Sequence, residues 1–376
     1  MKRMKKIGII TITGEANIGN ILQNFALVKV IKYMQMKALT IFNSFYKFQY
    51  AKWNVKAVAK RILKRNYMFS WRRFIFYSFS YRHIGIITGL QLSHSSIDGL
   101  HYCGFVFGAD QIWNLSYAFI EENKDFFFGT FAPKKKKIAY AASIGIDYIP
   151  PEYEAFFTNA INDFSYISVR EQKAADLIQQ YTGRKVPVTL DPTMLLTCEE
   201  WLKIAKKPKY IKKNEKFILV YFLGTMPVYV KQMLDAVCER YHLRQIDLYS
   251  EWAAGNPELL ENRQFKEKEY FTDPAEFVWL ISHCDLMVTD SFHGSVFSIL
   301  FKKPFRCFER MEKGVENMSS RMQTLFSQFG ITNWCIGHEK EDLDHIFETD
   351  FSSVDTVLSR ERKKSLNYLK EALNSL

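Results

Sequence analysis

The sequence predicts an α/β protein made of two Rossmann-like domains. Short apolar segments alternate with amphipathic ones in two series, which is typical of parallel sheets covered by helices. A Lys-rich run that contains Pro208 separates the two series and indicates a linker. We therefore expect an N-terminal Rossmann-like domain at 1–200, a linker at 201–216, a C-terminal Rossmann-like domain at 217–350 and a closing helix at 351–376.

The composition indicates a globular protein with a strongly basic N-terminal part. The chain has 376 residues, of which 48% are hydrophobic and 24% are charged, enough for two domains with sizeable cores. Its net charge is +11, but the first hundred residues alone hold 17 Lys and Arg against two acids. That part carries +15, which leaves −4 on the rest of the chain, so the basic character is local.

The six cysteines lie far apart in the sequence, and none belongs to a CxxC pair. This distribution is typical of reduced cysteines in a cytoplasmic protein and predicts neither a disulfide framework nor a metal site. No apolar run reaches the roughly 20 residues of a membrane-spanning helix, so any contact with a membrane is expected at its surface.

The chain opens with a strand, a loop and a helix. We expect the strand at Lys6–Thr13, then the loop Gly14–Gly19, then a helix that starts at Asn20 and repeats apolar residues at helical spacing. The loop lacks the glycine patterns of dinucleotide-binding and P-loop sites, so the sequence predicts neither site here. Gly14 and Asn17 are candidate ligand contacts, and ordinary turn formation explains them equally well.

Residues 50–84 interrupt the alternation. Basic residues are interleaved here with large aromatic and aliphatic ones, which predicts one or two basic amphipathic helices. The basic residues are Lys52, Lys56, Lys60, Arg61, Lys64, Arg65, Arg72, Arg73 and Arg82. Such a helix can lie on an anionic membrane surface, and an ordinary solvated face is the alternative. Nucleic acid binding ranks third, and we predict no such partner, because no nucleic-acid-binding motif accompanies the segment.

Polar residues follow the carboxyl ends of four strands predicted in the first domain. These strands are expected at Tyr102–Gly108, Lys137–Ala142, Tyr166–Val169 and Val186–Leu190, with helices at Glu152–Phe164 and Gln172–Tyr181. The polar residues that follow them are Asp110, Gln111 and Asn114, then Ser143, then Arg170 and Glu171, and finally Asp191. Because ligands bind at the carboxyl ends of parallel strands, these four clusters predict the ligand-binding edge of the sheet.

The second domain is expected to repeat this plan. Asp273, the first-turn Pro274 and the Glu276 three residues after the cap form the pattern of a helix start. The other elements are expected at Phe217–Phe222, Val228–Tyr241, Leu243–Tyr249, Leu286–Thr289, Phe305–Phe308, Met322–Phe329 and Ser353–Leu373.

The turn after the predicted strand Leu286–Thr289 is the strongest candidate for chemistry. It contains Asp290, Ser291, His293 and Gly294. The apolar run that follows predicts a helix that opens at His293-Gly294 and ends before Pro304. The amino end of a helix favours an anion, because its backbone N–H groups and the positive end of its dipole point outward. The alternative is that Asp290 and Ser291 cap the helix and that His293 is an ordinary turn residue.

Seven short motifs follow one another along the chain: Gly14–Gln23, Val106–Asn114, Ile138–Gly145, Ile167–Glu171, Leu190–Thr193, Thr289–Gly294, and Ser320-Arg321 before a helix. In this order they resemble the polysaccharide pyruvyl transferase family of bacterial surface-glycan loci. The resemblance extends from Lys6 to about Phe329 and leaves out the basic insertion. Each motif alone is weak, whereas seven in register are specific for the family.

The resemblance implies a GT-B-like fold, in which two Rossmann-like domains face each other across a cleft, here with a basic helical insertion in the first domain. It also implies transfer of a pyruvyl group from phosphoenolpyruvate to a sugar of a bacterial surface polysaccharide or of its lipid-linked precursor, giving a pyruvate ketal. It implies no metal and no cofactor besides phosphoenolpyruvate as the donor substrate. Arg170 matches a family arginine proposed to hold the donor, and His293 matches the histidine of an Arg-x-His element. Ser291 replaces the arginine of that element, so a hydroxyl stands where the family pattern has a charge.

The expected roles follow from this resemblance and from the chemistry of the side chains. His293 would be the acid, since histidine titrates nearest to neutral pH. Arg170 would bind one anionic group of the donor, and Ser291, Gly294 and Arg321 would bind the other. Asp290 would either orient His293 or cap the helix. Gly14, Asn17, Asp110, Gln111, Asn114 and Ser143 complete the expected substrate-binding set.

Two other functions stay open at this stage. A GT-B-type glycosyltransferase that uses a nucleotide sugar would need no arginine at position 291. A catalytically silent scaffold of a glycan-assembly complex would use the basic segment to attach to a membrane. The sequence predicts a cytoplasmic protein and leaves open a peripheral position at the inner face of the plasma membrane, a homodimer, and the identity of the acceptor sugar.

Overall fold

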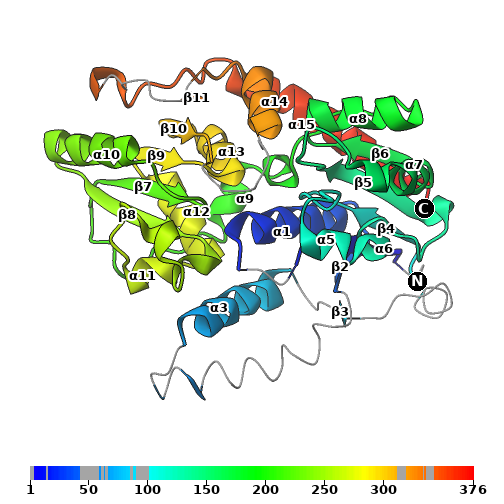
Figure 1. The fold of residues 1–376 in the computed structure, drawn as a ribbon, viewed down its shortest axis with the longest axis horizontal. Helices are drawn as coiled ribbons and strands as arrows, with labels where there is room; N and C mark the ends of the chain where they lie inside the picture. The colour runs from blue at the N-terminus through cyan, green and yellow to red at the C-terminus, as the bar shows by residue number, and fades with distance from the viewer. Residues whose placement is uncertain are drawn as a thin grey trace.

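The structure is a computed structural model that describes residues 4–13, 16–42, 59–60, 63, 67–84, 88–89, 101–310, 319–332, 334–335 and 343–376. It contains two parallel β-sheets, one in each half of the chain, and the two halves lie side by side with helix α1 (Ile18–Tyr33) near the middle (Figure 1). The prediction of two Rossmann-like domains in a GT-B-like arrangement is confirmed.

The first sheet has six strands in the order β3-β2-β1-β4-β5-β6. They are β1 (Lys6–Ile10), β2 (Lys37–Phe42), β3 (Thr88–Gly89), β4 (Gly104–Phe107), β5 (Lys137–Ala142) and β6 (Tyr166–Val169). The helices of this half are α1, α3 (Met68–His83), α5 (Ala118–Glu121), α6 (Lys124–Phe127), α7 (Glu154–Asn162), α8 (Gln172–Thr182) and α9 (Cys198–Leu202). The strand order reverses between β1 and β4, which is where such a sheet opens a crevice for ligands.

The second sheet has five strands in the order β11-β10-β9-β7-β8. They are β7 (Phe217–Phe222), β8 (Arg244–Tyr249), β9 (Leu286–Thr289), β10 (Phe305–Phe308) and β11 (Trp334–Cys335). The helices are α10 (Val228–Tyr241), α11 (Glu267–Tyr270), α12 (Pro274–His283), α13 (Phe292–Phe301), α14 (Ser319–Phe329) and α15 (Val354–Asn374). Here the order reverses between β7 and β9, so the turn after β9 again lies beside a crevice.

Strands β1 and β4 and helix α7 are shorter than predicted, and two further local predictions about the first domain differ from the structure. The segment Val186–Leu190 is not a strand of the sheet, because it contributes a single β-bridge from Val188 to Val169. Helix α1 begins at Ile18 and not at Asn20, because the side chain of Asn17 already caps it by accepting a hydrogen bond from the Asn20 N–H (3.3 Å). Both differences concern where a short polar stretch joins the regular structure.

The predicted start of α12 is confirmed in detail. The Asp273 carboxylate accepts a hydrogen bond from the Glu276 N–H (2.8 Å), the Glu276 carboxylate accepts one from the Asp273 N–H (3.3 Å), and Pro274 is the first helical residue. This reciprocal capping satisfies two N–H groups that the helix itself leaves without acceptors.

Helix α15, red in Figure 1, returns from the second half to the first. Its Tyr368 hydroxyl donates to the carbonyl of Ala139 in β5 (3.0 Å), and its Ser365 hydroxyl accepts from the Leu190 N–H (3.0 Å). The last helix is therefore part of the packing of the first sheet.

The two halves share one continuous apolar core. Phe25 of α1 lies 5.4 Å from the Trp201 ring of α9, and that ring lies 4.9 Å from the Phe297 ring of α13, measured between centroids. Such aromatic contacts between α1 and the second half fix how the two sheets face each other. The space that stays open lies beyond this core, at the carboxyl ends of the strands.

Helix α3 of the basic insertion also joins the two halves. Its Arg72 is only 1% exposed and donates hydrogen bonds to the carbonyls of Tyr249 (2.9 Å) and Tyr270, with the guanidinium 4.8 Å above the Tyr270 ring. Burial lowers the Arg72 pKa, and the nearby Tyr270, Tyr221 and Glu251 oppose that effect. The sequence placed Arg72 on a basic outer surface, whereas the structure uses it as an internal donor to backbone carbonyls.

Most of the basic stretch before α3, including residues 50–58, lies outside the described residues, so the predicted membrane contact through 50–84 stays a prediction. Within the part of the chain that the structure describes, no helix is long and apolar enough to cross a membrane.

Candidate functional site

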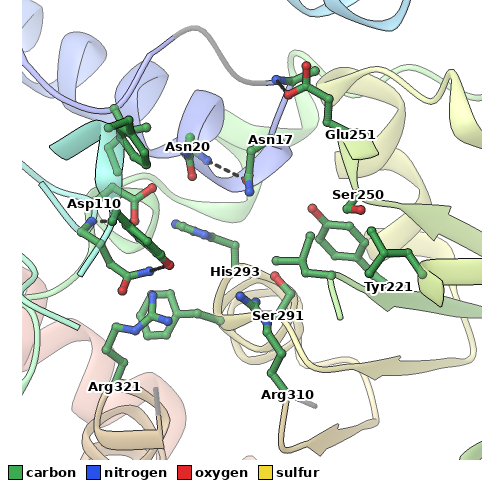
Figure 2. A pocket seen from close by; sticks show the side chains of 18 residues that line it. Asn17, Asn20, Asp110, Tyr221, Ser250, Glu251, Ser291, His293, Arg310 and Arg321 are labelled. Carbon is green, nitrogen blue, oxygen red and sulfur yellow. Dashed lines mark hydrogen bonds between the residues drawn. The ribbon is translucent and has the colours of Figure 1, made fainter. Parts of the chain in front are cut away.

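A cavity of about 310 Å³ lies between the two halves at the carboxyl ends of the strands (Figure 2). Residues that follow strands of both sheets line it: Ile12 follows β1, Asp110 follows β4, Leu223 follows β7 and Ser291 follows β9. The two strand-order reversals therefore face the same space, which is the position of ligand sites in open α/β sheets. Its volume lies at the lower end of the range of about 300–1,000 Å³ for small-molecule sites.

The structure brings half of the predicted site residues to this cavity. Those that line it are Asn17, Asp110, Gln111, Ser291, His293 and Arg321. Those that lie outside its lining are Asn114, Ser143, Arg170, Asp290 and Gly294, and Gly14 is not among the described residues.

The amino ends of two helices lie at the cavity, and a side chain from the first turn of a third reaches it. Asn17 is the N-cap of α1 and Ser291 is the N-cap of α13, and both line the cavity. Arg321 lies in the first turn of α14 and lines it as well. The first N–H groups of a helix lack acceptors within that helix, and its dipole is positive at this end. This convergence favours an anionic ligand.

Two arginines, Arg310 and Arg321, add positive charge on one side of the cavity. Figure 2 shows Arg310 and Arg321 on one side of the cavity, and Asn17 and Asn20 on the opposite side, with His293 between them. Arg321 is buried, and burial together with the nearby charges of Arg170 and Arg310 lowers its pKa to about 10. It is therefore still a cation at neutral pH.

Arg310 was not predicted as a site residue. It follows strand β10, and its Nε lies 3.5 Å from the Asp290 Oδ2. The rule that polar residues after a strand form the binding edge applies to Arg310 as well as to Asp110. No motif surrounds Arg310 in the sequence, so only its position after a strand could have indicated it.

His293 reaches across from α13 to the first half of the molecule. Its side chain is nearly buried, with 7% of the residue exposed, and its Nε2 lies 3.6 Å from the Asp191 Oδ2. On the other side, the ring packs against Gly19 of α1, where an added Cβ would lie 2.1 Å from the His293 Nδ1. A side chain at position 19 would occupy the space that the imidazole now fills.

Asp290 has neither of its expected roles. Its carboxylate accepts hydrogen bonds from the N–H groups of Leu223 (2.7 Å) and Gly224 (2.8 Å), so it fixes the loop after β7. The cap of α13 is Ser291, whose hydroxyl accepts from the Gly294 N–H (3.4 Å). Gly294 is needed for packing instead, because a Cβ there would lie 2.6 Å from the Thr289 Oγ1.

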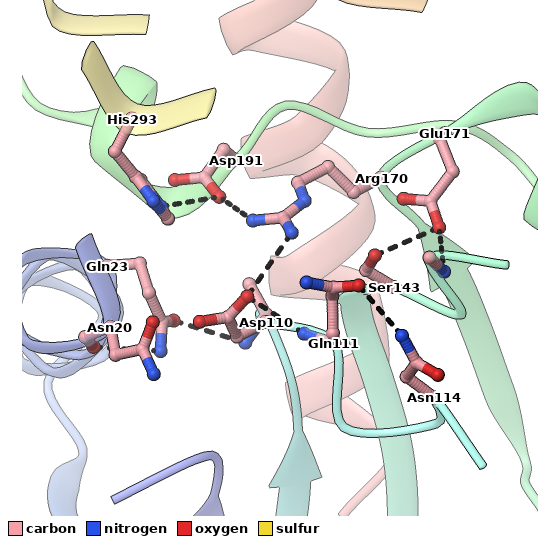
Figure 3. A network of polar contacts seen from close by, with 12 residues as sticks. Asn20, Gln23, Asp110, Gln111, Asn114, Ser143, Arg170, Glu171, Asp191 and His293 are labelled. Carbon is pink, nitrogen blue, oxygen red and sulfur yellow. Dashed lines mark hydrogen bonds and ion pairs between the residues drawn. The ribbon is translucent and has the colours of Figure 1, made fainter. Parts of the chain in front are cut away.

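Arg170 lies behind the cavity wall, between two carboxylates (Figure 3). Its Nη1 lies 2.7 Å from the Asp191 Oδ2 and its Nη2 lies 3.3 Å from the Asp110 Oδ1. Burial tends to lower the Arg170 pKa, but these carboxylates raise it above its usual value. The guanidinium also lies 4.3 Å above the Phe292 ring. Protein carboxylates thus contact both Nη atoms of Arg170, and its expected contact with a ligand stays a prediction.

Asp191 is the carboxylate that joins this network to His293. Burial alone would raise its pKa, but His293, Arg170 and Thr193 outweigh that effect and hold the pKa well below its usual range. Asp191 is therefore ionised at neutral pH. The sequence placed it in a motif but not among the site residues.

Two predicted residues support the loops around the cavity. The Ser143 hydroxyl donates to the Glu171 Oε1 (2.9 Å), which also accepts from the N–H groups of Ile144 and Gly145. The Asn114 amide donates to the Gln111 Oε1 (3.0 Å). Both side chains fix the ends of β4 and β5.

The side of the cavity opposite the arginines is polar but carries fewer cations. Glu251 lies there, and its carboxylate accepts from the Ala16 N–H (2.7 Å) and pairs with Arg73 of α3. Asn20 and Ser250 are further lining residues that the sequence did not suggest. Amide, hydroxyl and carboxylate groups suit the hydroxyls of a sugar.

Among the described residues, no group of three or more His, Cys, Asp or Glu side chains is placed to hold a metal ion. The five cysteines that can be assessed, Cys103, Cys198, Cys238, Cys284 and Cys307, form no disulfides.

Several solved structures are similar to this chain at low sequence identity. The UDP-GlcNAc 2-epimerase from Methanocaldococcus jannaschii, in complex with UDP-GlcNAc and UDP, is 12% identical, with a TM-score of 0.48 over 99% of each chain. The UDP-GlcNAc 2-epimerase from Neisseria meningitidis is 10% identical, with a TM-score of 0.45 over 97% of this chain and 94% of that one. MurG from Acinetobacter baumannii is 8% identical, with a TM-score of 0.45 over 100% of each chain.

No curated protein matches the chain. A match to a protein family covers residues 17–310, which include every described part of the cavity wall except Ile12, Ala16 and Arg321. The family description is polysaccharide pyruvyl transferase, as the seven motifs suggested. The chain therefore belongs to the polysaccharide pyruvyl transferase family.

Proposed function

We propose that this protein transfers a pyruvyl group from phosphoenolpyruvate to a sugar of a bacterial surface polysaccharide, or of its lipid-linked precursor, and forms a pyruvate ketal. One observation carries the proposal beyond family membership. The amino end of α13 lies at one cavity together with Arg310, Arg321 and His293. That combination offers positive charge for an anionic donor and a proton donor beside it.

Phosphoenolpyruvate carries a phosphate and a carboxylate, and both would bind on the arginine side of the cavity. Arg321 and the first N–H groups of α13 would hold one of them, and Arg310 the other. Arg310 lines the cavity with Ser291 and would supply the charge that the family pattern has at position 291. Burial and, after it, the like charges of Arg170 and Arg310 lower the pKa of Arg321, so a bound anion would offset part of the cost of this buried cation.

The sugar would lie on the opposite side, near Asn17, Asn20 and Glu251. His293 would protonate the methylene carbon of the donor, which leaves the central carbon open to attack by a sugar hydroxyl. A second hydroxyl of the same sugar would then displace phosphate from that carbon and close the ketal. Of the two hydroxyl protons lost, one replaces the proton that His293 gave and the other leaves with phosphate.

The test combines ligand binding and turnover. Phosphoenolpyruvate should raise the melting temperature, because it binds the folded protein, and a panel of nucleotide sugars should not. Phosphate release from phosphoenolpyruvate should depend on an added glycan acceptor and should be lost in His293→Gln. The control at the surface is Arg240→Gln, because Arg240 is exposed on α10 and pairs with Asp344. A thermal shift produced by a nucleotide sugar and not by phosphoenolpyruvate would contradict the proposal.

A further inference from the structure

We infer that Asp191, held by Arg170, positions His293 so that Nε2 keeps its proton and Nδ1 is the nitrogen that exchanges a proton with the donor. The catalytic part of this inference rests on the proposed function. The assignment of the His293 tautomer does not rest on it, so the tautomer and the catalytic role can be tested separately.

The Asp191 carboxylate is fixed in one orientation. Its Oδ1 accepts from the Thr193 N–H (3.0 Å) and the Thr193 hydroxyl (2.7 Å), and its Oδ2 faces Arg170 Nη1 (2.7 Å) and His293 Nε2 (3.6 Å). Asp191 is 2% exposed and is not part of the cavity lining. It can therefore act on a ligand only through a neighbouring side chain, and His293 is the neighbour that lines the cavity.

Arg170 keeps this carboxylate ionised and is not part of the cavity lining. It is buried between Asp191 and Asp110, so its single positive charge is shared by two negative ones (Figure 3). The pair of carboxylates leaves a net negative charge beside His293. That charge is available to stabilise an imidazolium.

The surroundings of the two ring nitrogens differ. Within the described residues, the His293 Nε2 is buried and has no hydrogen-bond acceptor closer than the Asp191 Oδ2. The Nδ1 lies close to Gly19 of α1, which has no side chain to pair with it, and unlike Nε2 it is not among the buried polar atoms without a partner. In a neutral imidazole one nitrogen carries the proton, and a carboxylate selects the nitrogen that it faces. Asp191 thus selects the Nε2–H form.

The proton balance follows from this choice. The imidazolium gives its Nδ1 proton to the methylene carbon of the donor and becomes a neutral ring with Nε2–H directed at Asp191. A proton from the attacking sugar hydroxyl then returns to Nδ1. The bond from Nε2 to its proton is never broken, so Asp191 itself stays ionised throughout.

The first experiment measures the tautomer directly, without any ligand. Nitrogen-15 spectra of histidine-labelled protein at alkaline pH report which ring nitrogen carries hydrogen, and His293→Gln assigns the signal among the eight histidines. Wild type should show the Nε2–H form, and Asp191→Asn should lose that preference. A wild-type signal of the Nδ1–H form would overturn the inference, even if Asp191→Asn fails to fold.

The second experiment separates positioning from binding. Asp191→Asn should lower kcat by about 10- to 100-fold, as loss of the partner that orients a functional histidine does, while the KM for phosphoenolpyruvate changes little. Asp247→Asn is the control, because Asp247 is a buried carboxylate paired with Arg263 in the second half. An unchanged kcat in Asp191→Asn would overturn the inference. The Nε2–H tautomer in a protein without pyruvyl transfer would support the positioning by Asp191 and refute the proposed function.

Discussion

Replacement of Gly19 by Ala tests whether the position of the His293 ring controls catalysis. The added Cβ would lie 2.1 Å from the Nδ1, and ordinary van der Waals contact begins near 3.4 Å. Since Gly19 is in the first turn of α1, the imidazole is the group that must move, by about 1.3 Å. A displacement of about 1 Å at a reacting group can reduce the rate about 100-fold, so we expect a loss of that order in kcat/KM.

The measurement is phosphate release from phosphoenolpyruvate with a glycan acceptor, compared with the melting temperature of each variant. Alanine favours a helix over glycine by up to about 1 kcal/mol, so α1 itself should not be weakened. The matched control is Gly255→Ala, because an added Cβ there meets nothing within 4 Å. If Gly19→Ala kept kcat/KM within about threefold of wild type, the ring position would not control the rate, and the reasoning would fail.

Three further predictions concern the buried arginines. Arg321→Met should raise the free energy of unfolding by up to about 3 kcal/mol, because folding lowers the pKa of this arginine to about 10 while it stays charged at neutral pH in both the folded and the unfolded state. The same variant should lose the thermal shift produced by phosphoenolpyruvate. A melting temperature below that of wild type would contradict the predicted gain in stability. In wild type, calorimetric affinity for phosphoenolpyruvate should fall as the pH rises through about 10, where Arg321 loses its proton, and a flat profile up to about pH 11 would exclude Arg321 as a ligand. Arg72→Met should lower the free energy of unfolding in urea by at least about 2 kcal/mol, because it leaves buried carbonyls without donors, whereas Arg82→Met on the exposed end of α3 should change it little.

Regular elements with strong local signals could be predicted from the sequence. Strands β5, β6, β7, β9 and β10 have the predicted bounds, and so does α10. These segments are continuous apolar runs or strongly periodic ones. The capping pattern at Asp273 is also local, since every group it needs lies within four residues. Periodicity and caps suffice where the interactions that form an element are near in sequence.

The candidate site could be predicted only in part, because its geometry depends on contacts between distant residues. The polar residues after predicted strands indicated Asp110, Ser291 and His293, and the family resemblance added Arg321. Nothing local shows that Arg170 is enclosed by two carboxylates or that Asp290 binds the loop after β7. A motif gives the residue types, whereas the partners of a charged side chain are decided by the packing around it.

The basic insertion shows the same limit. Spacing and charge indicated an amphipathic helix, and α3 is a helix, but Arg72 faces the backbone carbonyls of the second half. Large aromatic residues follow the arginines closely in this segment, so the sequence alone did not reveal which side of the helix is buried. An arginine that satisfies several carbonyls at once can be a core residue.

The return of α15 to the first sheet has a consequence for how the protein is made. Ser365 and Tyr368 bind the backbone at Leu190 and Ala139, more than 170 residues earlier in the chain. On the ribosome the first half therefore emerges without one of its supporting helices and waits for the whole second half to be translated. During that interval its apolar surface beneath α15 is exposed, which makes the nascent first half a natural client for chaperones and makes its maturation depend on the last helix.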